Sequence, residues 1–263
     1  MRRPLVVSLT AVLLSSTLLT TSVTAKAASP AILRSAAVVL PVAPPGAAPV
    51  LASGITPVMA PKGLRRPALT ILDTYAFQYV SASGEPGRWD PCTPISWRLY
   101  KPGAPKGVLA LLKRDFKKVS AASGLTFVYK GYAPRSAVRA EQPGITIAFM
   151  PRSSMLAVDG VPNASGSASL SGIETPSGRV VLTGATVTFL RSRFSPRKKV
   201  SVWEPLILHE LAHAVGLDHV DDASQVMYPY ERSFREYQPG DLAGLKRLGI
   251  EAGCNPIVDP QLS

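Results

Sequence analysis

The chain has 263 residues, a hydrophobic content of 46% and a net charge of +12. This apolar content is sufficient for a core, which excludes a largely disordered chain, and the length accommodates one large domain or two small ones. No repeat, heptad pattern or nucleic-acid-binding motif accompanies the positive charge. We therefore interpret it as solvated surface charge and expect no nucleic-acid partner, although a basic surface could also favour acidic substrates or anionic cell-wall polymers.

The first 27 residues have the pattern of a secretory signal peptide. Arg2 and Arg3 precede an apolar stretch at residues 5–19, and small residues follow as far as Ala27. The apolar stretch is too short and too rich in Ser and Thr for a membrane span, so an uncleaved anchor is the less favoured alternative. We predict a secreted, extracellular protein that could associate with a cell wall and has no stable membrane association.

Residues 28–67 form a segment rich in Ala, Pro, Val and Gly that carries little charge. Its prolines between Pro41 and Pro61 disfavour regular structure, so the segment is predicted to be a linker or a short propeptide. One domain is expected from residue 68 to residue 263, and we expect it to be a monomer.

The pattern of apolar residues then predicts strands and one helix in chain order. An early extended segment is expected at 70–72 or 75–80. Alternating or continuous apolar runs predict strands at 94–100, 125–130, 145–150 and 179–190. Apolar positions at helical spacing predict an amphipathic helix over 107–122, which Gly124 ends. The Gly- and Ser-rich segment 163–178 is predicted to be a loop with one short strand, formed by Ser167, Ala168, Ser169 and Leu170.

Two cysteines flank these elements, Cys92 before the first predicted strand and Cys254 after the last predicted helix. In a secreted protein an even number of cysteines favours a disulfide, and two unrelated buried thiols are the alternative. Neither cysteine has a partner at metal-ligand spacing. We therefore predict a disulfide between Cys92 and Cys254.

The next helix carries the residues on which the functional interpretation depends. It begins between Ser201 and Pro205, because Ser201 suits a capping box and Pro205 suits a first-turn proline. The motif is His209-Glu210-Leu211-Ala212-His213-Ala214-Val215-Gly216-Leu217-Asp218-His219. His209 and His213 are four residues apart, so a helix places both on one face, where they can share one zinc ion.

His219 completes the motif only if the helix ends before it. Gly216 supplies that end, because glycine adopts the left-handed backbone conformation without steric cost. Three histidines leave the fourth zinc position open, which is typical of a catalytic site. Glu210 is placed to act as general base toward a water that the metal activates. Buried core histidines are the alternative, but the chain has only these three and all lie at ligand spacing.

Met227 follows in the sequence Ser224-Gln225-Val226-Met227-Tyr228-Pro229-Tyr230. Behind the long histidine motif, this order resembles the Met-turn of the metzincin zinc peptidases, and most closely that of a bacterial matrixin. The resemblance covers roughly residues 88–250. It implies an α+β, metzincin-like zincin fold with a mixed, twisted sheet of about five strands, two long helices and a small C-terminal lobe.

The same resemblance assigns roles to further residues. It implies that Met227 forms an apolar floor below the zinc and that Ser167–Leu170 pairs with the backbone of an extended substrate. It also places Tyr228, Pro229 and Tyr230 at the substrate. Matrixins usually have a tyrosine four residues after the methionine, where this chain has Glu231.

One catalytic Zn²⁺ is the expected cofactor, and a second zinc held by histidines is excluded because no histidine remains. Ca²⁺ is possible but unsupported, since the loop acids form no recognised oxygen cage. These acids are Asp159, Glu174, Asp221 and Asp222. Asp218 either braces a zinc ligand or is a solvated loop acid.

We conclude from the sequence that the protein is a secreted zinc endopeptidase that acts on a protein or peptide substrate. A zinc hydrolase for cell-wall peptides is one alternative, and a secreted zinc-binding module without catalysis is another. Glu210 argues against the binding module, because binding zinc requires only the histidines.

Overall fold

The computed structural model describes residues 32–34, 38–39, 74–81, 83–138, 142–155, 164–175, 177–230 and 232–257. The expected signal peptide, the prolines of the expected linker, the segment 70–72, Asp159 and Glu231 lie outside these residues. Across the described ranges, no helix combines the length and apolar character needed to cross a membrane.

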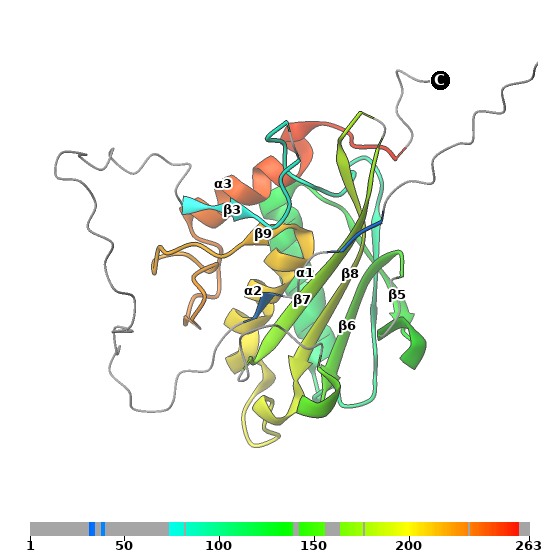
Figure 1. Ribbon diagram of the computed structural model, residues 1–263. Coiled ribbons are helices and arrows are strands. Elements are labelled where there is room, and N and C mark those ends of the chain that lie inside the picture. Colours follow the sequence, from blue (N-terminus) through cyan, green and yellow to red (C-terminus); the bar gives the residue numbers. More distant parts are fainter. Residues whose placement is uncertain are drawn as a thin grey trace, which may run out of the picture.

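A mixed sheet forms one layer of the molecule (Figure 1). Its five main strands are β4 (Ile95–Leu99), β5 (Phe127–Tyr132), β6 (Gly144–Met150), β7 (Gly166–Glu174) and β8 (Val180–Leu190). Their order in space is β7-β8-β6-β4-β5; β8, β6, β4 and β5 are parallel, and β7 is antiparallel to β8. The predicted mixed sheet of about five strands is confirmed.

Two short strands, β1 (Ile32–Arg34) and β2 (Val38–Val39), pair antiparallel with β7 on the side away from β8. The sequence predicts a linker without regular structure here. That prediction depended on prolines that disfavour regular structure, but no proline occurs between Pro30 and Pro41. The intervening stretch therefore keeps all its backbone donors and can join a sheet edge.

β7 is longer than its predicted core of four residues. Ser167, Ser169 and Ser171 alternate along the strand with Ala168 and Leu170, which belong to the core. Successive side chains of a strand point to opposite faces, so the serines share the face of the sheet opposite that core. Serine and glycine are weak strand formers, and pairing with β8 over nine residues overrides their local preference.

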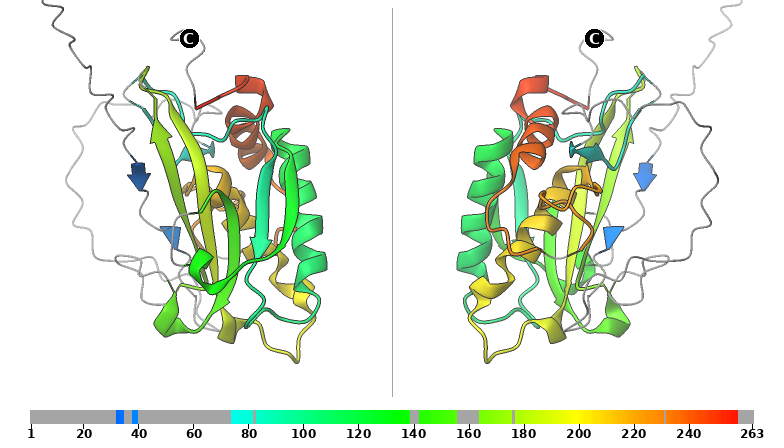
Figure 2. Two further views of the ribbon diagram at one scale, coloured as in Figure 1. Left: turned by 90° about the vertical axis from the view of Figure 1, so that its right-hand side faces the viewer. Right: turned by 90° about the vertical axis from the view of Figure 1, so that its left-hand side faces the viewer.

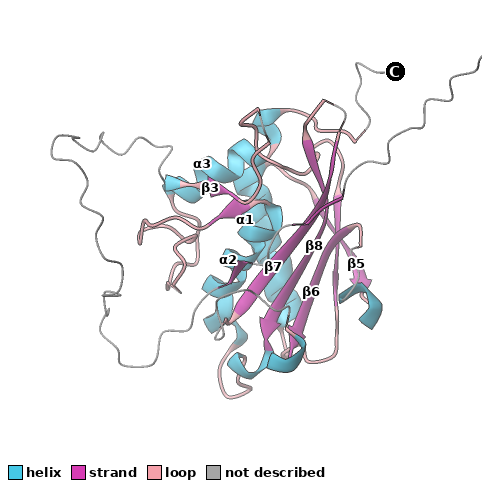
Figure 3. Cartoon of the chain, in the orientation of Figure 1, coloured by secondary structure: helices cyan, strands magenta, loops and turns pink. Residues whose placement is uncertain are grey.

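Three helices cover the other face of the sheet: α1 (Val108–Ser123), α2 (Glu204–Val215) and α3 (Pro239–Leu248) (Figure 2). Short 3₁₀ turns are η2 (Arg135–Val138), η3 (Arg152–Ser154), η4 (Arg191–Arg193), η5 (Val200–Trp203) and η6 (Ile250–Ala252). A separate small sheet joins β3 (Ala76–Phe77) to β9 (Leu217–Asp218) beside α3 (Figure 3).

Helix α2 begins at Glu204, within the predicted interval between Ser201 and Pro205. Ser201 lies in η5 and makes no capping bond for α2, whose first turn contains Pro205. Helix α3 begins before Asp241: Gln238 is its N-cap, and Asp241 completes the capping box from the third helical position.

The predicted disulfide between Cys92 and Cys254 is present, with the two Cα atoms 5.3 Å apart. Hydrogen bonds support it on both sides, because Asn255 N donates to Asp90 Oδ1 at 2.8 Å and Arg88 Nη1 donates to Gly253 O at 2.7 Å. The C-terminal segment is therefore attached to the residues that lead into β4.

Candidate metal centre and active site

Helix α2 carries the first half of the histidine motif through the centre of the molecule. All twelve of its residues are buried, so its polar side chains lie in the core. Gly216 ends the helix with φ of 118°, and its N–H donates to Ala212 O and His213 O. β9 then pairs with β3, which turns the chain so that His219 faces the helix.

The three histidine rings converge on one point. His219 Nε2 lies 3.1 Å from His209 Nε2 and 3.2 Å from His213 Nε2. On the opposite side of two rings, His209 Nδ1 donates to Val226 O and His213 Nδ1 donates to Leu217 O, both at 2.7 Å. These carbonyls fix the tautomer in which each Nε2 carries a lone pair, and the lone pairs are directed at the shared point.

This donor set fits a zinc ion. Burial and the neighbouring His219 lower the pKa of His209 to about 3, and burial likewise lowers the pKa of His213 and of His219. The rings are thus neutral at neutral pH, as metal binding requires. Tetrahedral zinc with bonds of about 2.0–2.1 Å places its nitrogen ligands about 3.3 Å apart, close to the two observed separations.

Glu210 lies next to the first ligand and is completely buried. Neither carboxylate oxygen has a hydrogen-bond partner within the described parts of the chain, and burial raises the pKa of Glu210 well above its usual value. The carboxylate faces Gly166 at the start of β7, where any Cβ would overlap it. An unpartnered carboxylate beside three imidazoles is costly to bury unless the site receives a polar or charged group.

The Met-turn packs against this centre. Val226 O accepts the bond from His209, and Met227 is 1% exposed in the main core. Asp241 accepts from both backbone N–H groups of this turn, Val226 N at 2.8 Å and Met227 N at 3.1 Å. The first turn of α3 therefore holds the Met-turn in place.

Gln78 is a site residue that sequence analysis missed. Its Nε2 lies 3.1 Å from His213 Nδ1 and donates to Leu217 O, also at 3.1 Å. Its backbone N–H donates to Gly216 O at 3.0 Å, which attaches the segment after β3 to the end of α2. The contact spans 135 residues, so no local pattern could reveal it.

Gly166 was also missed, because a glycine in a Gly- and Ser-rich segment does not stand out.

The other residues predicted for the site differ in their exposure and contacts. Tyr228 and Pro229 are half-buried after the Met-turn, and Tyr230 is 48% exposed. Asp218 braces the backbone of a ligand, since its Oδ1 accepts from His219 N at 2.8 Å.

The acids considered for Ca²⁺ do not form a metal site in the described ranges. The only groups there with three potential ligand atoms in mutual reach are the three histidines and a set of Asp90 with the two disulfide-bonded cysteines. Thiols joined in a disulfide are not available to a metal. Glu174, Asp221 and Asp222 belong to neither group.

Converging neutral imidazoles beside an unpaired carboxylate define a metal site of the zinc-peptidase type. The family model for matrixin matches residues 89–248, more than half of the chain, and the protein belongs to the matrixin family of zinc metallopeptidases. This match confirms the metzincin-like α+β fold that the sequence predicted. A search of curated protein sequences found no match to the chain.

Proposed function

We propose that the protein is a secreted zinc endopeptidase in which Glu210 is the general base. The observation that carries this proposal is the buried, unpartnered Glu210 carboxylate, one residue from His209 and facing Gly166. A zinc site that served only to stabilise the fold would have no use for this carboxylate. The N-terminal pattern of Arg2, Arg3 and an apolar stretch supports secretion.

His209, His213 and His219 would hold the zinc. When bound, zinc polarises the scissile carbonyl and lowers the pKa of a water at the open position. Glu210 accepts a proton from the attacking water and delivers it to the amine of the leaving peptide. Its buried environment raises its affinity for that proton and excludes competing solvent.

The outer edge of β7 is the proposed site for the substrate backbone. Here β1 and β2 already pair with it as antiparallel neighbours, which supports the capacity of this edge to bind an extended peptide. The predicted residues Ser167–Leu170 lie in the middle of this strand. Val38–Val39 pairs with Ser167 and Ala168, next to the Gly166–Glu210 contact.

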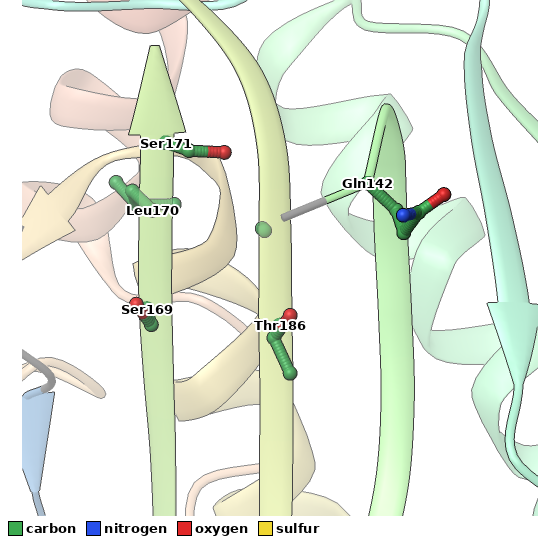
Figure 4. A pocket seen from close by; sticks show the side chains of 6 residues that line it. Gln142, Ser169, Leu170, Ser171 and Thr186 are labelled. Atoms are coloured by element: carbon green, nitrogen blue, oxygen red, sulfur yellow. The ribbon is translucent and has the colours of Figure 1, made fainter. Parts of the chain in front are cut away.

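The hollow that the described residues form on the serine-bearing face of β7 is too small for a substrate side chain. This hollow, beside Ser169, Ser171, Thr186 and Gln142, has a volume of about 20 Å³, sufficient for about one water (Figure 4). Backbone pairing at the edge of the strand is therefore the proposed mode of binding.

The test compares Glu210→Gln with the matched surface variant Glu251→Gln in hydrolysis of casein and of a quenched fluorescent peptide. Loss of a general base lowers the rate by roughly 10²–10⁴-fold, so we expect this loss in Glu210→Gln with zinc content unchanged. Glu251 is exposed, and its variant should retain full activity.

Substantial hydrolysis by Glu210→Gln would remove Glu210 from the mechanism. Stoichiometric zinc without any hydrolysis by the unaltered protein would indicate a binding module. Cleavage of purified peptidoglycan but not of casein would reassign the substrate to cell-wall peptides.

A further inference from the structure

The positive charge of the chain is concentrated at one end of the fold. The strands β4, β5, β6 and β8 are parallel, so their carboxyl ends lie at the same edge of the sheet. The segments that follow them, residues 100–107, 132–138, 150–155 and 190–203, contain nine cations and no acid. We call these cations the basic end: Lys101, Lys106, Arg135, Arg152, Arg191, Arg193, Arg197, Lys198 and Lys199.

The basic end accounts for most of the net charge. Its nine cations leave a net charge of +3 for all other residues of a chain whose total is +12. Sequence analysis interpreted the excess as solvated surface charge, and the four segments are separated along the chain. The fold brings the segments after β4, β6 and β8 to the lower end of the view in Figure 1, and the segment after β5 lies beside the end of β5.

The loops are also joined by contacts. A Cβ on Gly103 would lie 3.1 Å from Arg191 Cδ, and a Cβ on Gly107 would lie 3.5 Å from Val200 Cγ1, so the loop after β4 packs against the loop after β8. Most of the cations are exposed, including the run Arg197–Lys199. Like charges held this close repel one another, which a polyanion would relieve.

A hollow of about 210 Å³ lies between these two loops. Its lining includes the apolar side chains of Pro105, Phe194, Val200 and Trp203, together with the exposed Lys106 and Lys198. An apolar wall with ammonium groups beside it suits a sugar ring that carries acidic substituents. The ring's C–H face can contact Pro105 and Val200, the half-buried part of the wall, while its anionic groups bind the lysines.

The aromatic rings here are poorly placed to stack nucleic-acid bases. Trp203 is buried, and both Arg193 and Lys198 lie over its ring at 5.6 Å from the centroid. Tyr132 is exposed, but Lys101 lies over its ring at 5.3 Å. Binding of single-stranded nucleic acid normally depends on open aromatic faces.

We propose that the basic end binds a linear anionic polysaccharide, one that carries sulfate, phosphate or carboxylate groups along its length. The site lies on loops distinct from the histidine centre and uses none of the residues assigned to catalysis. Such binding would hold the peptidase on an anionic matrix while its metal centre remains available.

The test measures binding of a fluorescent heparin oligosaccharide to the purified full-length protein between 50 and 200 mM NaCl. The variant Arg197→Gln/Lys198→Gln/Lys199→Gln should bind on the order of tenfold more weakly at 100 mM NaCl. The slope of log affinity against log salt should fall by about 2, because each lost ionic contact releases about 0.7 fewer counterions. A second variant, Lys101→Gln/Lys106→Gln, should weaken binding in the same direction.

The control variant, Lys117→Gln/Lys246→Gln/Arg247→Gln, removes the same charge from exposed positions on α1 and α3. It should change the affinity about twofold or less, since exposed charges beyond a Debye length are screened. All variants should keep the melting temperature and peptide hydrolysis of the unaltered protein. Glu210→Gln should bind heparin normally, which separates this proposal from the catalytic one.

The proposal fails if the unaltered protein does not bind heparin or if the control triple variant weakens binding as much as the basic-end variant. It also fails if single-stranded DNA binds more tightly than heparin with the same dependence on Arg197–Lys199, which would assign the surface to nucleic acid. Tighter binding to phosphatidylglycerol vesicles would assign it to a membrane.

Discussion

Helices α1 and α2 lie side by side in the core but are buried in different ways. Eight of the sixteen residues of α1 are buried, and its outer face is rich in lysine. All twelve residues of α2 are buried, including His209, Glu210, His213 and Glu204. The first helix is therefore amphipathic, whereas the second is enclosed on every side.

The polar residues of α2 are accommodated in two ways. Glu204 is neutralised by the other helix, because Arg114 Nη2 lies 2.8 Å and Lys118 Nζ 3.0 Å from its Oε1. Glu210 has no such partner within the described residues, and the three histidines direct their lone pairs at one another. Helix α1 therefore supplies cations that neutralise a buried acid, whereas α2 brings an unpartnered carboxylate next to three imidazoles whose arrangement fits a metal ion.

The largest effect is expected when a metal ligand is removed from α2. His213→Ala should lose nearly all bound zinc and all detectable peptidase activity, because two remaining imidazoles do not complete the site. Metal analysis of the purified protein by mass spectrometry checks this outcome. One equivalent of zinc retained after dialysis would show that His213 is not a ligand.

A substitution in α1 should show the opposite response. Leu112 is fully buried, and Leu112→Ala should lower the free energy of unfolding by about 2–5 kcal/mol through lost packing and a residual cavity. Urea denaturation measures the change. Zinc content and kcat/KM should be unchanged at temperatures where the variant is folded, and a matching loss of zinc would contradict separate roles for the helices.

Gln78 contacts a metal ligand of α2 although it belongs to neither helix. Gln78→Leu should raise the Kd for zinc about 10–100-fold, as is typical when a residue that orients a metal ligand is lost. Competition with a chromogenic chelator measures this affinity. Gln142→Leu is the matched control on an exposed loop, and equal zinc affinity in the two variants would show that Gln78 does not position His213.

The smallest expected effect lies at the α1–α2 contact. Burial and the charge of Glu204 raise the pKa of Asp115 to about 7. Between pH 4 and 7 the folded protein thus keeps a proton that the unfolded chain releases, so this residue's contribution to stability falls as pH rises and is constant above pH 7. Burial disfavours the charge of Glu204, but Lys118 and Arg114 outweigh this effect and lower its pKa. This stabilises the folded protein at every pH above the usual pKa of 4.5 and is lost only at lower pH, so it does not change the trend between pH 5 and 8.

Between pH 5 and pH 8, the free energy of unfolding of Asp115→Asn should therefore rise by about 1–2 kcal/mol relative to that of the unaltered protein. Thermal unfolding across this pH range measures the difference. Parallel melting curves at all pH values would show that Asp115 does not titrate between the two helices.

Sequence patterns predicted features that depend on residues close together in the chain. The helix at 107–122 follows from its apolar spacing, and the zinc ligands follow from a motif of eleven residues. The strand at 125–130 was placed two residues early, because its register is set by pairing of Phe127 with Ile95. In the Ser- and Gly-rich segment only Ser167–Leu170 was predicted as a strand, because the full length of β7 depends on its pairing with β8.

Features that depend on distant segments could not be predicted. Gln78 reaches His213 only because β3 pairs with β9, and Gly166 matters only because β7 passes Glu210. The basic end likewise arises from four separate segments that a parallel sheet delivers to one edge. Each requires knowledge of strand order, which local residue patterns do not contain.

The bond between Cys92 and Cys254 closes a ring of the chain that contains nearly the whole of the catalytic domain, since its ends are 162 residues apart. A peptidase is exposed to cuts by other copies of itself, most readily at loop tips. Any single cut inside this ring leaves both fragments covalently connected. A nicked molecule would therefore keep its full mass on a non-reducing gel and separate into two pieces only after reduction.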